Sequence, residues 1–101
     1  MLLYLIKQGE TMTDITILRL PEVLIKSGSK RSTLWHQIKE GIFVPPIKLG
    51  GRSSGFIKHE IEAVIAARAL GLPETEVKKL VRNLVERRKQ SASKLLQELV
   101  A

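Results

Sequence analysis

Glycine and proline divide residues 20–71 into short segments, and this spacing limits the folds that the chain can adopt. Gly28 and Gly41 each follow a run with helical spacing, and glycine readily takes the positive φ that ends a helix. Pro45 and Pro46 require an extended connector, because proline disfavours helix at the residue before it. A glycine-rich loop between two short apolar segments then predicts a hairpin. The expected order is helix, turn, helix, connector and hairpin.

The first helix of this frame is expected at about 21–26, and the second is expected to end at about Glu40. Ser29 is a candidate cap for the second helix, because its hydroxyl can accept a bond from an early backbone N–H. Leu34 and Ile38 are four residues apart and predict the buried face of that helix. The opposite face and its flanks then carry Arg31, Ser32, Thr33, Trp35, His36 and Lys39.

The hairpin is expected to pair two short strands at 47–49 and 55–57 around a five-residue loop at 50–54. A third helix follows at about 58–70, and Gly71 ends it. Its inward face has apolar residues at helical spacing. The residues expected on that face are Ile61, Val64, Ile65 and either Arg68 or Ala69.

The C-terminal part of the chain, after Pro73, carries an apolar stripe with helical spacing that is interrupted at 86–90. Periodicity is consistent with one long helix or with two helices. The stripe could complete the core of the domain or pair with another copy of the chain. The run Arg87-Arg88-Lys89 is interpreted as a solvated face that could add phosphate contacts. The stripe consists of Val77, Leu80, Val81, Leu84, Val85, Leu95, Leu96, Leu99 and Val100.

Three regions are expected along the 101 residues: an N-terminal arm at 1–14, a helical domain at 15–71 and a helical extension at 72–101. The arm could be disordered. A short extended lead-in is expected at 15–19. The apolar run at 1–6 is far below the ~20 residues of a spanning helix and lacks the flanks of a signal peptide. A cytoplasmic location is therefore expected.

Basic residues are concentrated between positions 26 and 59. This third of the chain holds seven Lys or Arg against the single acid Glu40, which gives +6 of the formal net charge of +7. Such a concentration favours a polyanionic partner, nucleic acid first and an anionic membrane surface second. The seven cations are Lys26, Lys30, Arg31, Lys39, Lys48, Arg52 and Lys58.

The sequence lacks the residues that several kinds of catalytic, metal-binding and nucleotide-binding sites require. The chain has no cysteine, and its two histidines, His36 and His59, are too far apart for a local metal motif. The glycine-rich loop is not followed by the Gly-Lys-Ser/Thr of a nucleotide-binding loop. No paired carboxylates or Ser/His/Asp set is present at useful spacing. We therefore expect no enzyme activity, no metal site and no cofactor.

Residues 19–68 resemble the AlpA-type prophage regulators and related phage excisionases, within the wider group of MerR-like winged helix-turn-helix domains. The resemblance rests on ordered motifs: LPEV, the SG turn, RST before an aromatic residue, IKEG, PP, KLGGR and the EI-A-I helix. The chain departs at Ser29-Lys30, where a hydrophobic residue and Ser are usual. It also departs at His36, where Arg is common, and at Phe56, where Trp is frequent.

The resemblance implies a mainly α fold with a small β-hairpin, that is, a winged helix-turn-helix. It also implies sequence-specific binding of double-stranded DNA by a protein of a phage or integrative element. Such a protein regulates transcription, acts as an excisionase (recombination directionality factor), or does both. Integrase and RNA polymerase are the partners to expect, and 74–100 could form a homo-oligomer.

DNA contacts are expected from the second helix and the hairpin. An α-helix fits the major groove, and the loop glycines let the backbone and Arg52 approach a phosphate or the minor groove. The alternatives are a solvated helix face, a hairpin whose glycines serve only the turn, and a Trp35 that packs on the hairpin or under the first helix. The expected contact residues are Arg31, Ser32, Thr33, Trp35, His36, Lys39, Lys48, Arg52 and Ser53.

A different function remains open from the sequence. The basic face could dock an acidic protein partner, with the C-terminal helices as a further contact surface. DNA footprinting separates the two hypotheses, since a sequence-specific DNA-binding protein protects a defined sequence whereas an interaction module protects none.

Overall fold

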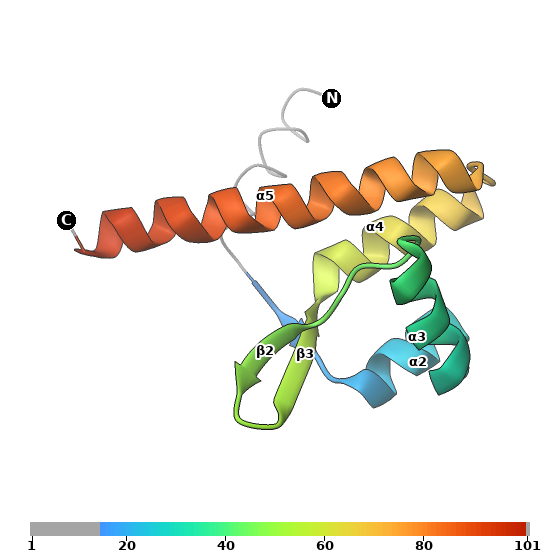
Figure 1. Cartoon of the computed structure of the whole chain (residues 1–101), viewed down its shortest axis with the longest axis horizontal. Helices are drawn as coiled ribbons and strands as arrows, with labels where there is room; N and C mark the ends of the chain where they lie inside the picture. The colour runs from blue at the N-terminus through green and yellow to red at the C-terminus, as the bar shows by residue number, and fades with distance from the viewer. Residues whose placement is uncertain (1–14, 101) are drawn as a thin grey trace.

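The computed structural model describes residues 15–100, so the N-terminal arm expected at 1–14 lies outside the described residues. The fold is mainly helical with a small three-stranded antiparallel sheet, as predicted for a winged helix-turn-helix (Figure 1). A long C-terminal helix crosses the molecule beside the preceding helix. The elements are β1 (Ile17–Leu18), α2 (Leu20–Ser27), α3 (Arg31–Glu40), β2 (Ile47–Gly50), β3 (Ser53–Ile57), α4 (Lys58–Ala69) and α5 (Glu74–Val100).

Strand β3 is the centre of the sheet and pairs with both neighbours. It pairs with β1 through Ile17 and Ile57, so the lead-in segment forms a strand rather than only an extended entry. The predicted five-residue loop of the hairpin is wrong. Gly50 pairs with Ser53, so the strands continue into the expected loop and leave a turn of two residues, 51–52. Gly50 allows this tight turn because its φ of 135° is a backbone conformation that residues with a side chain rarely adopt.

Both early helices end where glycine was predicted to end them. Gly28 closes α2 with φ 66°, and Gly41 closes α3 with φ 82°. The predicted cap by Ser29 is wrong, because α3 begins at Arg31 and Lys30 occupies the capping position. Ser29 therefore lies one residue too early, and among residues 15–100 no side chain caps the first turn of α3.

The core is built from every helix and from the sheet. Fully buried side chains come from α2, α3, the connector, β3 and α4, and the first half of α5 adds Val77 and Val81. On α4 the inward face continues with Arg68, which is partly buried over the Phe43 ring, and not with the exposed Ala69. Ala67, which was not predicted, is buried as well, with 4% exposed. Helical spacing accounts for both residues, because Ala67 and Arg68 lie three and four residues after Val64 on the same face.

Helix α5 is one continuous helix of 27 residues whose two halves differ. Its first half packs on α4 and the core through Val77, Leu80, Val81 and Leu84. Its last turns expose their apolar side chains, and no part of 15–100 covers them. The exposed residues are Leu95, Leu96, Leu99 and Val100, with exposed fractions from 44% to 81%. No helix within 15–100 combines the length and the apolar character needed to cross a bilayer.

Candidate nucleic-acid interface

The buried stripe of α3 determines which of its side chains face outward. Leu34 is fully buried and Ile38 packs partly against the core, so the opposite face of the helix is left to solvent. The exposure predicted for that face is therefore observed, whereas contact with DNA remains a prediction. The exposed residues are Arg31, Ser32, Thr33, His36 and Lys39.

Trp35 connects α3 to the hairpin. Its ring centroid lies 6.4 Å from that of Phe56 on β3, with the planes tilted by 44°. Phe56 is buried and in turn meets Phe43 edge-on, at 6.3 Å between centroids. Trp35 therefore packs on the hairpin and not under α2. It remains 39% exposed, so part of the indole is also available to a ligand.

The hairpin presents its three predicted residues to solvent. Lys48 lies on β2, Arg52 lies in the turn, and Ser53 begins β3. Arg19, which the sequence analysis did not select, adds a cation at this edge. Its Nη1 atom donates to the carbonyl oxygen of Ser54 at 3.4 Å. Only its place just before the first helix could have suggested it.

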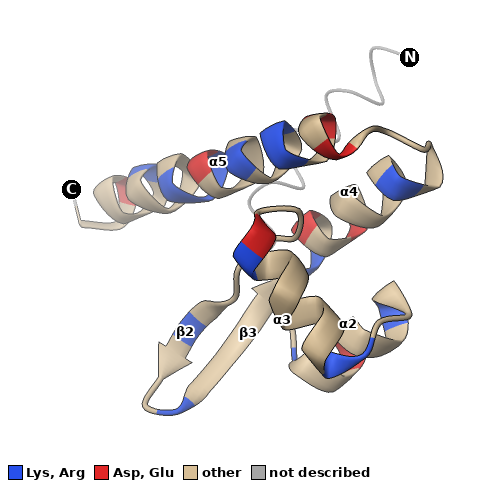
Figure 2. Ribbon diagram, turned by 45° about the vertical axis from the view of Figure 1, so that its right-hand side comes forward, with Lys and Arg blue, Asp and Glu red and all other residues tan. Residues whose placement is uncertain are grey.

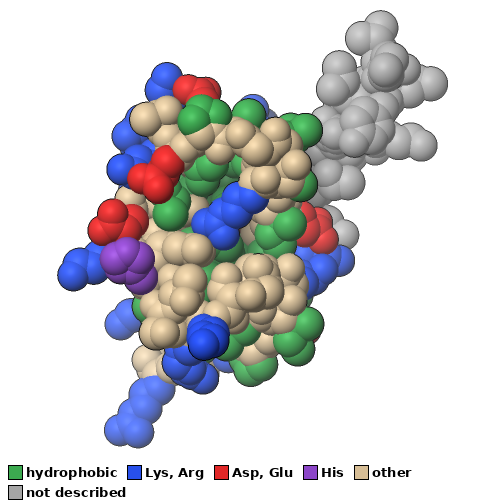
Figure 3. All heavy atoms as spheres, turned by 90° about the vertical axis from the view of Figure 1, so that its right-hand side faces the viewer, with side chains coloured by type: hydrophobic (Ala, Val, Ile, Leu, Met, Phe, Trp, Pro, Cys, Tyr) green, Lys and Arg blue, Asp and Glu red, His purple; other side chains and the backbone are tan. Residues whose placement is uncertain are grey.

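The cations of α3 and the hairpin are not neutralised within the described part of the chain. The ion pairs there involve Lys26, Lys78, Lys79 and Arg88, and none involves a cation of α3, β2 or the hairpin turn. Figure 2 shows basic positions on α3, on β2 and at the hairpin turn, and an acidic position at the end of α3. Figure 3 shows Lys and Arg side chains projecting from the lower edge, and Lys and Arg mixed with Asp and Glu on the left edge. Exposed cations without an acidic partner attract a polyanion.

Arg68 binds the connector between α3 and the hairpin. Phe43 and Val44 are fully buried, and Arg68 donates from Nη2 to the carbonyl oxygen of Ile42 at 2.9 Å. The Arg68 guanidinium also lies 5.5 Å from the centroid of the Phe43 ring, a cation–π contact. Burial lowers the pKa of Arg68 from its usual value, because the charged form loses solvation.

The interpretation of Arg88 as part of a solvated face is wrong. Its Nε atom donates to Glu60 Oε2 at 3.0 Å, and its Nη2 atom donates to the carbonyl oxygen of Pro45 at 2.9 Å. Only 16% of the Arg88 side chain and 1% of the Glu60 side chain are exposed. A signal was present, because Arg88 lies four residues after Leu84 and seven after Val81, on the inward stripe of α5.

The described residues contain no cluster of side chains that could bind a metal ion. Between 15 and 100, no three His, Asp or Glu side chains gather closely enough to hold an ion. His36 is exposed on α3, and His59 is exposed at the start of α4.

Comparison with known proteins identifies a family and a relative. The family described as "Prophage CP4-57 regulatory protein (AlpA)" matches residues 16–69, more than half of the chain. An uncharacterized protein, ORF88, of Enterobacteria phage P4 is 38% identical over 63 residues, which cover 59% of this chain and 72% of ORF88. No solved structure matches the chain. The matched segment spans β1 to α4 and so contains α3, the connector and the hairpin, and the chain belongs to the AlpA family of prophage regulatory proteins.

Proposed function

We propose that this protein binds double-stranded DNA sequence-specifically, with α3 in the major groove and the hairpin on the adjacent backbone or minor groove. The observation that carries the proposal is the packing of Trp35 on Phe56, which joins α3 to the hairpin while the cations of both remain exposed and unpaired within 15–100. A rigid pair of basic elements suits a duplex, because phosphate contacts position a protein and base contacts specify its site.

The start of α3 supports a phosphate contact. No side chain of residues 15–100 caps this helix, so within that part of the chain its first backbone N–H groups are left for an anion, which the helix dipole also favours. Lys30 and Arg31 at that end are unfavourable for an isolated helix but favourable beside a phosphate. Ser32 and Thr33 fit phosphate contacts as well, whereas Arg31 and Lys39 can also reach guanine.

The biological role follows from the family. We propose that the protein regulates transcription in a phage or integrative element, acts as an excisionase, or does both. Several copies would bind adjacent sites, bend or coat the DNA, and recruit or block integrase or RNA polymerase. The exposed apolar end of α5 supports association between copies, because apolar side chains left in water favour burial against a partner.

Footprinting on fragments of the surrounding genome tests the proposal. We expect a defined protected sequence and a steep loss of affinity as salt rises, since each neutralised phosphate releases counterions. Arg31→Ala and Arg52→Ala should weaken binding, whereas Arg82→Ala, an equal loss of charge on the exposed side of α5, should have little effect. Absence of any protected sequence would favour an interaction module that binds an acidic protein.

A further inference from the structure

The connector that leads into the hairpin has few backbone hydrogen bonds of its own. Ile42 donates back to the end of α3, and between 43 and 46 no other backbone–backbone bond occurs in the described structure. The carbonyl oxygens of Ile42 and Pro45 are instead bound by side chains, those of Arg68 and Arg88. Two arginines from the C-terminal helices therefore supply the hydrogen bonds that hold this segment.

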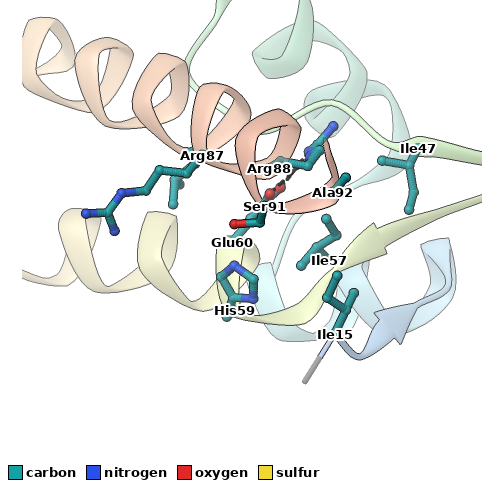
Figure 4. A pocket seen from close by; sticks show the side chains of 10 residues that line it. Ile15, Ile47, Ile57, His59, Glu60, Arg87, Arg88, Ser91 and Ala92 are labelled. Atoms are coloured by element: carbon teal, nitrogen blue, oxygen red, sulfur yellow. Dashed lines mark hydrogen bonds and ion pairs between the residues drawn. The ribbon is translucent and has the colours of Figure 1, made fainter. Parts of the chain in front are cut away.

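Arg88 joins three elements at one guanidinium group. It reaches from α5 to Glu60 on α4 and to Pro45 in the connector, and Figure 4 shows its contact with Glu60. A guanidinium is planar and donates in several fixed directions at once, so it can set the relative position of the groups that it binds. Pro45 is separated from β2 by one residue, and Lys48 follows closely.

The described residues leave a space beside the base of the hairpin. A cavity of about 250 Å³ lies between α5 and the sheet, lined by Ile47 and Ile57 at the base of the hairpin and by His59, Arg87 and Ala92 (Figure 4). Arg88 and Glu60 also line this space. The polar contact of Arg88 with Pro45 lies at the edge of this space and links α5 to the segment just before β2.

We infer that Arg88 is a positioning residue for DNA binding: it holds the connector so that the hairpin stays at the right distance and angle from α3. The inference rests on the proposed function and adds to it, because it makes the C-terminal helix part of the DNA-binding apparatus although α5 itself need not touch DNA. Without the contact between Arg88 and Pro45, α3 should still bind DNA, whereas the hairpin should lose its contacts with the DNA phosphates.

A paired substitution separates positioning from stability. Replacing a buried ion pair with apolar residues of similar volume is often neutral for stability. Arg88→Met together with Glu60→Leu therefore removes the bond to Pro45 without leaving a buried charge and without changing the net charge. The matched control is Lys79→Met with Glu76→Leu, which removes an exposed ion pair, 3.4 Å long, from the same helix.

The experiment measures DNA affinity of the full chain across a salt series, with a footprint on the sequence that the parent protects. For the paired variant we expect a fall in affinity on the order of 10-fold and a salt slope smaller by about 1–2, as for the loss of one or two phosphate contacts. Protection should shrink at the edge covered by the hairpin and persist under α3. The control should match the parent in all three readouts.

Each outcome decides a different question. A parent that protects no sequence contradicts the proposed function itself. If the parent protects a sequence and the folded paired variant shows the same affinity, salt slope and footprint, the inference about Arg88 is overturned. Should the paired variant not fold, Arg88→Lys replaces it, because a single ammonium keeps a charge for Glu60 but cannot reproduce the planar set of donors. Parent-like DNA binding by folded Arg88→Lys would equally overturn the inference.

Discussion

Two groups of arginines in this chain have opposite surroundings. Arg31 and Arg52 lie exposed on α3 and at the hairpin turn, without an ion pair in the described part of the chain. Arg68 and Arg88 are partly buried on α4 and α5, and each donates to a carbonyl oxygen of the connector between those two basic elements. The outer group is placed to meet a ligand, and the inner group holds the frame that presents it. The comparison shows that burial and position in the fold, rather than residue type, decide what an arginine does.

The inner group should dominate stability, and Arg88→Ala should have the largest effect of any arginine substitution. It leaves the carboxylate of Glu60, which is 1% exposed, without a partner, and breaking a buried pair costs about 3–5 kcal/mol. Urea unfolding measures the loss, and the matched Arg82→Ala should change the free energy of unfolding by less than about 0.5 kcal/mol. Equal effects of the two substitutions would erase the distinction between inner and outer arginines.

Arg68→Ala should come second. It removes the hydrogen bond to Ile42 and the contact with the Phe43 ring, which together are worth about 2 kcal/mol. Arg68→Lys should recover part of the loss, because an ammonium can also lie over the ring. Unfolding in urea again gives the value, and a loss below about 0.5 kcal/mol would remove Arg68 from the inner group.

The outer group should show the reverse pattern. Arg31→Ala and Arg52→Ala should each leave the free energy of unfolding within about 0.5 kcal/mol of the parent, because neither side chain is packed or paired in the described structure. Each should lower DNA affinity roughly 10-fold, about 1.4 kcal/mol. Fluorescence anisotropy with a labelled duplex gives the affinity, and unaltered binding by both variants would contradict their place in the interface.

Trp35 lies between the two groups and should show a mixed effect. Trp35→Ala loses the contact with Phe56, and aromatic pairs contribute about 1 kcal/mol beyond the area that they bury. Trp35→Phe should retain most of that stability. Thermal unfolding of the two variants without DNA tests the structural share, and equal melting temperatures for both would mean that the indole does not join α3 to the hairpin.

The smallest effect on the folded monomer is expected at the end of α5. Leu96→Glu changes a side chain that is 62% exposed and outside the core, so stability should move by less than about 0.5 kcal/mol. If copies of the chain associate through this end, the same substitution should lower the average mass seen by sedimentation equilibrium. A parent that stays monomeric on DNA and in solution would remove association from the proposed function.

Local patterns in the sequence predicted most of the frame. The glycines ended α2 and α3 where expected, and the spacing of Leu34 and Ile38 correctly predicted which face of α3 is exposed. These features depend on neighbouring residues and on one helical period, so the sequence carries them directly.

Contacts between distant residues were not predictable in the same way. Glu60 and Arg88 are 28 positions apart, and each stands alone as a charge on an otherwise apolar stripe. The sequence shows two anomalies, but only the packing of α4 on α5 shows that they compensate each other. The pairing of β1 with β3 could not be predicted for the same reason. In α5, Arg88 occupies the inward position within 86–90, so the helix continues through the segment that looked like an interruption.

The claim that α3 and the hairpin form one surface for a double helix is tested most directly by an NMR titration. The ¹⁵N-labelled full chain is titrated with the duplex that footprinting defines, at moderate salt. The largest amide shifts should fall together on 31–39 and 48–53, with small changes on the outer side of α5. Shifts concentrated on α5, or on only one of the two basic elements, would contradict the claim.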